Sequence, residues 1–154
     1  MVFTRNGPYR LLPAVLIAVL LNAPALWSQA NESTEDPAAL VGLSLEELIA
    51  RFGVPESVYP VRGPESWQDD VVFVYGNQDF YVYKDRIWQL GLNSVYGIKL
   101  GDSRAVAALI FEDLQLFDTY GVLSLPGRSW PMSLRLEWGS TAIISAIYLY
   151  RSDF

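Results

Sequence analysis

The chain has no cysteine and no histidine among its 154 residues. Without cysteine it forms no disulfide, and it offers no cysteine for a lipid anchor. Cysteine and histidine are also the usual ligands of zinc, copper and haem, so we expect no cofactor. Histidine is the usual base that activates a nucleophilic serine. These absences predict a protein that is not an enzyme.

Positive charge is scarce as well. The chain has 11 Lys and Arg residues against 17 Asp and Glu residues, and its formal net charge is −6. The basic residues form no run along the sequence. Nucleic acids and anionic lipid surfaces bind clustered positive charge. We therefore expect no nucleic-acid partner, and membrane contact only through an uncleaved N-terminal segment.

The first thirty residues have the pattern of a secretory signal peptide. Arg5 and Arg10 precede an almost uninterrupted apolar run over 11–27, and Ser28-Gln29-Ala30 has the small-x-small pattern of a cleavage site. The run is shorter than the roughly 20 apolar residues of a spanning helix. The pattern predicts export to the periplasm or the extracellular space. The alternative is that the segment is retained as an anchor. Cleavage would leave 124 residues with a formal net charge of −8.

The polar, acidic residues 31–39 predict a flexible tether. A helix follows, because Ser44 and Glu47 have the spacing of a capping box and Gly53 suits the position after the last turn. Between them, apolar residues recur with helical spacing. They are Leu45, Leu48, Ile49 and Phe52.

A second helix is predicted over 103–113, with Asp102 as its N-cap. Val106, Leu109 and Ile110 form its apolar side, which we expect to face the core.

The remaining segments predict an antiparallel meander, because they are short, rich in β-branched and aromatic residues, and separated by turn residues. The turns are expected at Gly76-Asn77, Lys84-Asp85 and 139–141. The predicted strands are 57–62, 70–75, 80–84, 86–92, 120–125, 133–138 and 142–150.

The two halves of this pattern resemble each other. A shift of 63 residues places Ser66-Trp67 on Ser129-Trp130, and the helices match at a shift of 58. The pattern predicts an α+β fold of two tandem units, 40–95 and 96–154, each with a helix on an antiparallel sheet.

Two segments carry a resemblance to a known group of proteins. Gly-Ile-Lys-Leu-Gly-Asp-Ser at 97–103 precedes a short helix, and the hairpin 81–90 supplies paired strands. Together they resemble small bacterial envelope modules with the β-lactamase-inhibitor-protein-like fold, including outer-membrane assembly lipoproteins of the SmpA/OmlA type. The resemblance implies a helix packed on a three- or four-stranded sheet and a tendency to bind other proteins. The acylated cysteine of the lipoproteins and the disulfides of the inhibitors have no counterpart here.

Two loops carry candidate binding residues. Trp67 and Asp69 precede a predicted strand. Either they contact a binding partner at the edge of the sheet, or the Trp67 ring covers one end of the sheet and Asp69 is solvated beside it. In the matching loop, 126–131, two prolines flank Arg128 and Trp130. These residues either present a preorganised cation and ring or stiffen the entry to the next strand.

The hairpin over 80–90 is rich in aromatic residues, and Tyr81 and Tyr83 lie on its alternating positions. An exposed aromatic face would suit a sugar or another protein, whereas a buried one would join the two halves. We expect an exported, non-catalytic module that binds or assembles with another envelope protein. The alternative is a module that binds carbohydrate or peptidoglycan through exposed aromatic residues. The sequence does not set the oligomeric state.

Overall fold

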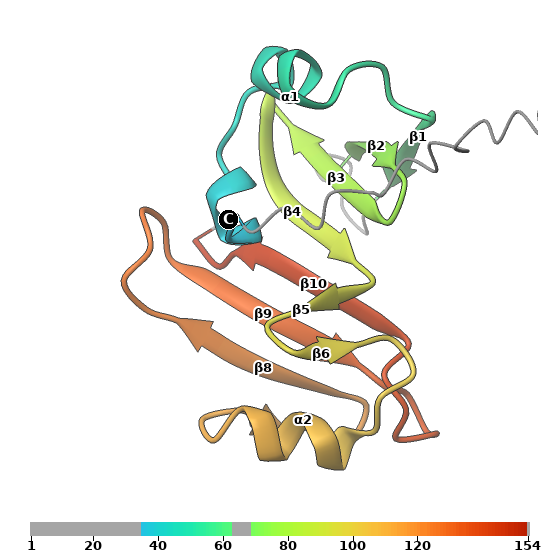
Figure 1. Cartoon of the computed structure of the whole chain (residues 1–154), viewed down its shortest axis with the longest axis vertical. Helices are drawn as coiled ribbons and strands as arrows, with labels where there is room; N and C mark the ends of the chain where they lie inside the picture. The colour runs from blue at the N-terminus through green and yellow to red at the C-terminus, as the bar shows by residue number, and fades with distance from the viewer. Residues whose placement is uncertain (1–34, 63–68, 154) are drawn as a thin grey trace, which may run out of the picture. The chain divides into compact units, whose positions relative to one another are not determined.

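The computed structural model describes residues 35–62 and 69–153, which form a large antiparallel sheet with a few short helices on it (Figure 1). The predicted signal peptide, the first residues of the predicted tether, and Trp67 lie outside the described residues. The helical segments are η1 (Pro37–Leu40), α1 (Leu45–Phe52) and α2 (Arg104–Ile110). A separate hairpin consists of β5 (Ser94–Val95) and β6 (Ile98–Lys99). The main sheet contains β1 (Ser57–Arg62), β2 (Asp69–Tyr75), β3 (Gln78–Tyr83), β4 (Arg86–Leu92), β7 (Gln115–Leu116), β8 (Tyr120–Leu125), β9 (Met132–Glu137) and β10 (Ala146–Arg151).

The eight strands follow the order β1-β2-β3-β4-β10-β9-β8-β7, and all neighbours are antiparallel. The central pair is β4 with β10, in which Leu90 lies opposite Leu149. The predicted fold of two tandem helix-plus-sheet units is therefore wrong: the strands form one sheet. Two separate sheets would each leave an unpaired inner edge, and the pairing of β4 with β10 satisfies both edges.

A single cluster of buried residues lies on one face of this sheet. It includes residues of η1, α1, the β5–β6 hairpin and α2, so all of these segments cover the same face (Figure 1). The strands contribute alternate residues, such as Phe80, Leu90, Leu134 and Leu149. The other residues of each strand line the opposite face.

Helix α1 confirms its prediction, and its ends are fixed locally. Ser44 Oγ accepts a hydrogen bond from the Glu47 N–H at 3.1 Å, and Glu47 Oε2 accepts one from the Ser44 N–H at 2.7 Å. Gly53 follows the helix with φ of 79°. Leu48 is fully buried, and the ring of Phe52 packs on the core.

Helix α2 differs from its prediction in its cap, its length and its orientation. Ser103, not Asp102, is the N-cap and accepts from the Val106 N–H at 3.3 Å. The buried residue of α2 is Ala107, so Leu109 and its apolar neighbours face outward. The helix packs on the core through the small side chain of Ala107, while Ala105 and Ala108 are exposed, so hydrophobicity alone predicted the wrong side.

The strands agree closely with their predictions, except at their ends. Both residues of the Lys84-Asp85 turn have positive φ, as a tight hairpin requires. The last strand begins at Ala146 rather than at 142. Strand β7 and the β5–β6 hairpin are too short to produce a visible alternation. Where the tether was expected to end, η1 forms and buries Ala38 and Leu40.

Candidate functional site

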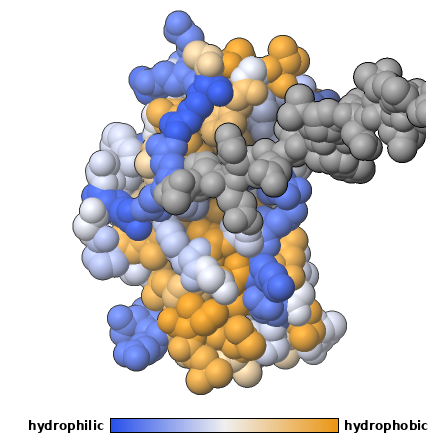
Figure 2. All heavy atoms as spheres, viewed as in Figure 1, coloured by the Kyte–Doolittle hydropathy of each residue, from blue (hydrophilic) through white to orange (hydrophobic). Residues whose placement is uncertain are grey.

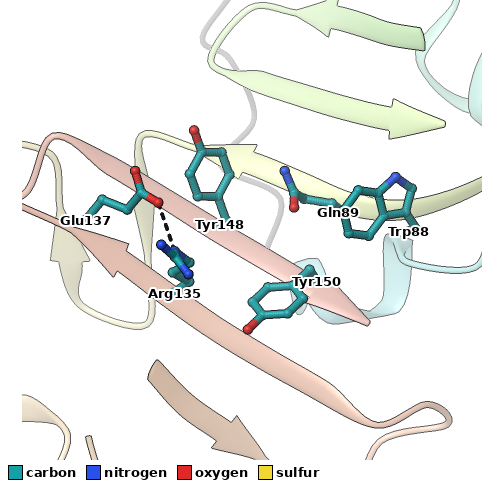
Figure 3. Close-up of a pocket in the computed structure, with 6 residues that line it drawn as sticks. All are labelled: Trp88, Gln89, Arg135, Glu137, Tyr148 and Tyr150. Carbon is teal, nitrogen blue, oxygen red and sulfur yellow. Dashed lines mark hydrogen bonds and ion pairs between the residues drawn. The ribbon is translucent and has the colours of Figure 1, made fainter. Parts of the chain in front are cut away.

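The face of the sheet opposite the core holds a pocket of about 300 Å³ (Figure 3). Its lining combines three aromatic rings with three polar side chains from adjacent strands, β4, β10 and β9. The lining residues are Trp88, Gln89, Arg135, Glu137, Tyr148 and Tyr150.

The pleat and one irregularity of the sheet direct these side chains into the pocket. Tyr148 and Tyr150 alternate with buried residues on β10, so they share the face away from the core. On β4, the register with β3 shifts: Tyr81 lies opposite Gln89, but Val82 lies opposite Ile87. Trp88 is the extra residue of this bulge. A bulge redirects side chains, and here both Trp88 and Gln89 line the pocket.

The charged residues of the pocket neutralise each other. Arg135 and Glu137 alternate along β9, and Arg135 Nε donates to Glu137 Oε1 at 2.8 Å. The guanidinium of Arg135 also lies 4.0 Å from the centre of the Tyr120 ring, which itself stacks on Phe117. The formal charge of the six lining residues is therefore zero.

Beside the pocket, Tyr81 contacts the ring of Tyr148 edge to face, with 6.3 Å between the ring centres. Burial raises the pKa of Tyr81, and the neighbouring Tyr148 adds to this effect. Burial also raises the pKa of Tyr148, helped by the negative charges of Glu137 and Asp79. Both phenols therefore remain neutral at physiological pH and keep their hydroxyl protons.

Gly91 provides the space for this arrangement. It lies opposite Tyr148 on β10 and opposite Asp79 on β3. A Cβ atom at this position would lie 3.2 Å from Asp79 Cβ and 3.6 Å from Tyr81 Cε2. Burial raises the pKa of the Asp79 carboxyl group.

The predicted loop residues Arg128 and Trp130 make contacts within the chain. Arg128 forms an ion pair with Asp36, which also accepts a hydrogen bond from Tyr96 at 2.6 Å. The Trp130 ring is 40% exposed, and the Arg151 guanidinium lies 3.9 Å from its centre. Their role in binding stays a prediction, although the structure gives both residues a role in holding the loop.

The other predicted binding residues are spread along the sheet. Asp69 begins β2, where its backbone lies opposite Arg62. Tyr81 lies next to the pocket through its contact with Tyr148, whereas Tyr83 ends β3 with the Lys84 Nζ atom 5.0 Å from its ring centre. Sequence reasoning missed Tyr148 and Tyr150 as binding residues. The signal was their Tyr-Leu-Tyr alternation, which places both rings on one face.

A second surface lies around α2. Leu109 is 84% exposed, and Val106 and Ile110 on the same side of the helix are 38% and 41% exposed. Ile143 is also exposed and is held beside the start of α2 by a bridge to Ser103. Figure 2 shows hydrophobic residues gathered at the end of the molecule that carries α2. We call Val106, Leu109, Ile110 and Ile143 the α2 surface.

Within the described ranges, no group of acidic side chains has the arrangement of a metal site. No helix in that same part of the chain has the length and hydrophobicity needed to cross a membrane.

Comparisons with known proteins give no match to a family model and no match among curated proteins. Two similar solved structures are an extracellular protein containing an SCP domain from Bacillus anthracis and a cysteine-rich secretory protein from Staphylococcus aureus. The first has 11% identity and a TM-score of 0.49, over 79% of this chain and 47% of the other. The second has 15% identity and a TM-score of 0.47, over 78% of this chain and 47% of the other.

These comparisons contradict the resemblance to β-lactamase-inhibitor-protein-like and SmpA/OmlA modules. No family model matches, and the described strands form one eight-stranded sheet instead of the three- or four-stranded sheet that the resemblance implies. Both of the similar proteins are described as extracellular or secretory. The chain spans about half of the length of each, and a likeness of this extent carries no conclusion about its activity.

Proposed function

We propose that this chain is an exported, non-catalytic module that binds another protein through the α2 surface. The observation that carries the proposal is the outward apolar side of α2. Single exposed apolar residues are common on protein surfaces. A group of large apolar side chains that lie together on the surface usually marks an interaction site. Export is supported by the signal-peptide pattern of residues 1–30.

The charge around the α2 surface specifies the chemistry of its partner. Residues 105–127 contain no Lys or Arg, whereas Glu112, Asp113 and Asp118 in this segment are exposed. Arg104, at the start of α2, lies over the Trp138 ring, with 5.3 Å from its guanidinium to the ring centre. A partner with an apolar centre and a basic rim would complement this surface.

A second copy of the chain complements this surface less well than a basic partner does. In a symmetric dimer, the same patch would face itself and place acidic residues opposite acidic residues. Such like-charge pairs oppose association. The partner is therefore a different protein.

Site-specific photocrosslinking tests the proposal. A photoreactive phenylalanine derivative at position 109, introduced into the chain secreted by its own cells, should give one discrete crosslinked product. The same residue at position 54 is the matched control, because Val54 is 89% exposed but lies in the loop after α1. Combining the probe at 109 with Glu112→Lys and Asp113→Lys should abolish the product, because these changes reverse the charge of the rim.

Two outcomes would overturn the proposal. One is a product with the mass of two copies of the chain, which would identify self-association. The other is an equal yield of the same products from positions 109 and 54, which would show that the α2 surface has no preferred partner.

A further inference from the structure

The pocket on the opposite face of the sheet has the chemistry of a sugar-binding site. Pyranose rings present an apolar C–H face, which packs on aromatic rings, and an edge of hydroxyl groups. Here Trp88, Tyr148 and Tyr150 supply rings. The amide, guanidinium and carboxylate groups of the same lining can donate hydrogen bonds to the sugar hydroxyl groups and accept hydrogen bonds from them.

The charge of the pocket indicates a neutral ligand. The carboxylate of Glu137 is held by Arg135 at 2.8 Å, so an anion or a cation would have to compete with that ion pair. The guanidinium is also held over the Tyr120 ring. The phenol of Tyr148, whose pKa is raised above its usual value by burial, is uncharged. A ligand rich in hydroxyl groups needs no opposite charge in the pocket. It can form hydrogen bonds with the polar atoms of Arg135 and Glu137 that their ion pair leaves available.

The size and construction of the pocket also suit a short saccharide. Its volume of about 300 Å³ lies at the lower end of ligand pockets, which span roughly 300 to 1,000 Å³. The rings stand on paired strands rather than on loops, and Tyr81 supports the Tyr148 ring from the side. A site fixed in this way loses little conformational entropy on binding.

We propose that the pocket formed by Trp88, Gln89, Arg135, Glu137, Tyr148 and Tyr150 binds a neutral oligosaccharide. Sugar rings stack on the tyrosines of β10, and their hydroxyl groups bond to Gln89 and to the Arg135–Glu137 pair. The site lies on the face of the sheet that the described helices leave open, so it is independent of the α2 surface.

Isothermal titration calorimetry of the full exported chain tests the site. The probes are chitohexaose and cellohexaose as neutral ligands, and hexagalacturonate as an anionic one. We expect at least one neutral probe to bind and the anionic probe to bind more weakly. Tyr148→Ala and Tyr150→Ala should each lower the association constant at least tenfold, because each removes a stacking ring.

Control variants separate binding from folding. Tyr150→Phe keeps the ring and should retain most of the affinity. Val58→Ala removes an exposed side chain on β1, at the far edge of the sheet, and should leave affinity unchanged. The double variant Leu109→Ser, Ile110→Ser should also bind normally, so failure of the sugar site and failure of the α2 surface are distinguishable.

The proposal is wrong if neither neutral probe gives a heat of binding. It is also wrong if hexagalacturonate binds more tightly than both neutral probes, or if the tyrosine-to-alanine variants keep full affinity. Near-ultraviolet circular dichroism checks that each variant is folded. If a tyrosine variant is unfolded, Gln89→Ala takes its place, and the same loss of affinity is expected.

Discussion

A single tryptophan restricts the packing beside the end of β9. Trp138 follows β9, is 1% exposed, and donates from its indole Nε1 to the Asp118 carbonyl at 3.0 Å. Its ring lies against Gly121 on the neighbouring strand β8. A Cβ atom at Gly121 would come within 2.7 Å of the ring carbon Cη2, closer than real contacts allow. The glycine is therefore required by the ring beside it.

Gly121→Ala should destabilise the protein by about 1–3 kcal/mol, the usual cost of forcing extra volume into a packed core. The free energy of unfolding, measured by urea denaturation, checks this expectation. Ser124→Ala on the same strand is the control, because Ser124 is exposed, and it should change stability by less than about 0.5 kcal/mol. Equal effects of the two variants would show that the ring moves aside without cost.

At the scale of elements, Asp36 connects three segments that are distant in the sequence. Its side chain caps η1 by accepting from the Ala38 N–H at 3.0 Å, accepts from the Tyr96 hydroxyl, and pairs with Arg128. Burial by itself would raise the pKa of this carboxyl group. The hydrogen bonds from Tyr96 and Ala38, with the charge of Arg128, outweigh that effect and lower the pKa below its usual value. The charged form is therefore favoured in the folded state.

The pH dependence of Asp36→Asn follows from this direction. A carboxyl group with a lowered pKa stabilises the fold at a pH above its unfolded value, about 3.9, and this contribution is lost as pH falls through the folded pKa. Asp36→Asn should therefore be less stable than the unmodified chain at pH 7. The difference should shrink steadily below about pH 4.

Urea denaturation at several pH values measures this difference, with Asp113→Asn as an exposed control that should show none. A difference that stays constant from pH 7 to pH 3 would mean that Asn replaces every contact of the charged group, and that the charge of Asp36 contributes nothing.

For the whole molecule, the pairing of β4 with β10 makes the two halves of the sequence one structure. The buried cluster contains residues from both halves, and the sheet crosses from one to the other without a gap. A single domain of this size usually unfolds in one cooperative step. The two halves should therefore not melt separately.

Differential scanning calorimetry should show one transition, with equal calorimetric and van't Hoff enthalpies. Leu48→Ala in the first half and Leu136→Ala in the second should each shift that one transition by an amount equivalent to about 2–5 kcal/mol, because both side chains are fully buried. Two transitions, with each variant moving only one of them, would contradict a single folding unit.

The elements most accurately predicted from the sequence depend on neighbours in the chain. The reciprocal bonds of Ser44 and Glu47 span three residues, and Gly53 ends the helix through its own backbone. The Lys84-Asp85 turn and the strand over 86–92 are also decided within a few residues. For such features, capping, turn chemistry and alternation are sufficient.

The candidate site was only partly predictable, because it depends on contacts between distant segments. Alternation predicted that half of the hairpin aromatics face away from the core, and Tyr81 does lie beside the pocket. The bulge that places Trp88 next to Gln89 depends on the register of β3 with β4, and Tyr148 reaches them only because β10 pairs with β4. No local pattern records either pairing.

The sequence by itself determined the cap of α1, the turns, most strands, the acidic charge and the lack of histidine and cysteine ligands. Tertiary structure decided that the strands form one sheet, that α2 packs through Ala107 and exposes Leu109, and that Arg128 pairs with Asp36. The physical reason is the separation along the sequence over which each kind of interaction acts. Backbone preferences act over a few residues, whereas the choice of strand neighbours and of the buried side of a helix depends on which surfaces the complete chain can cover.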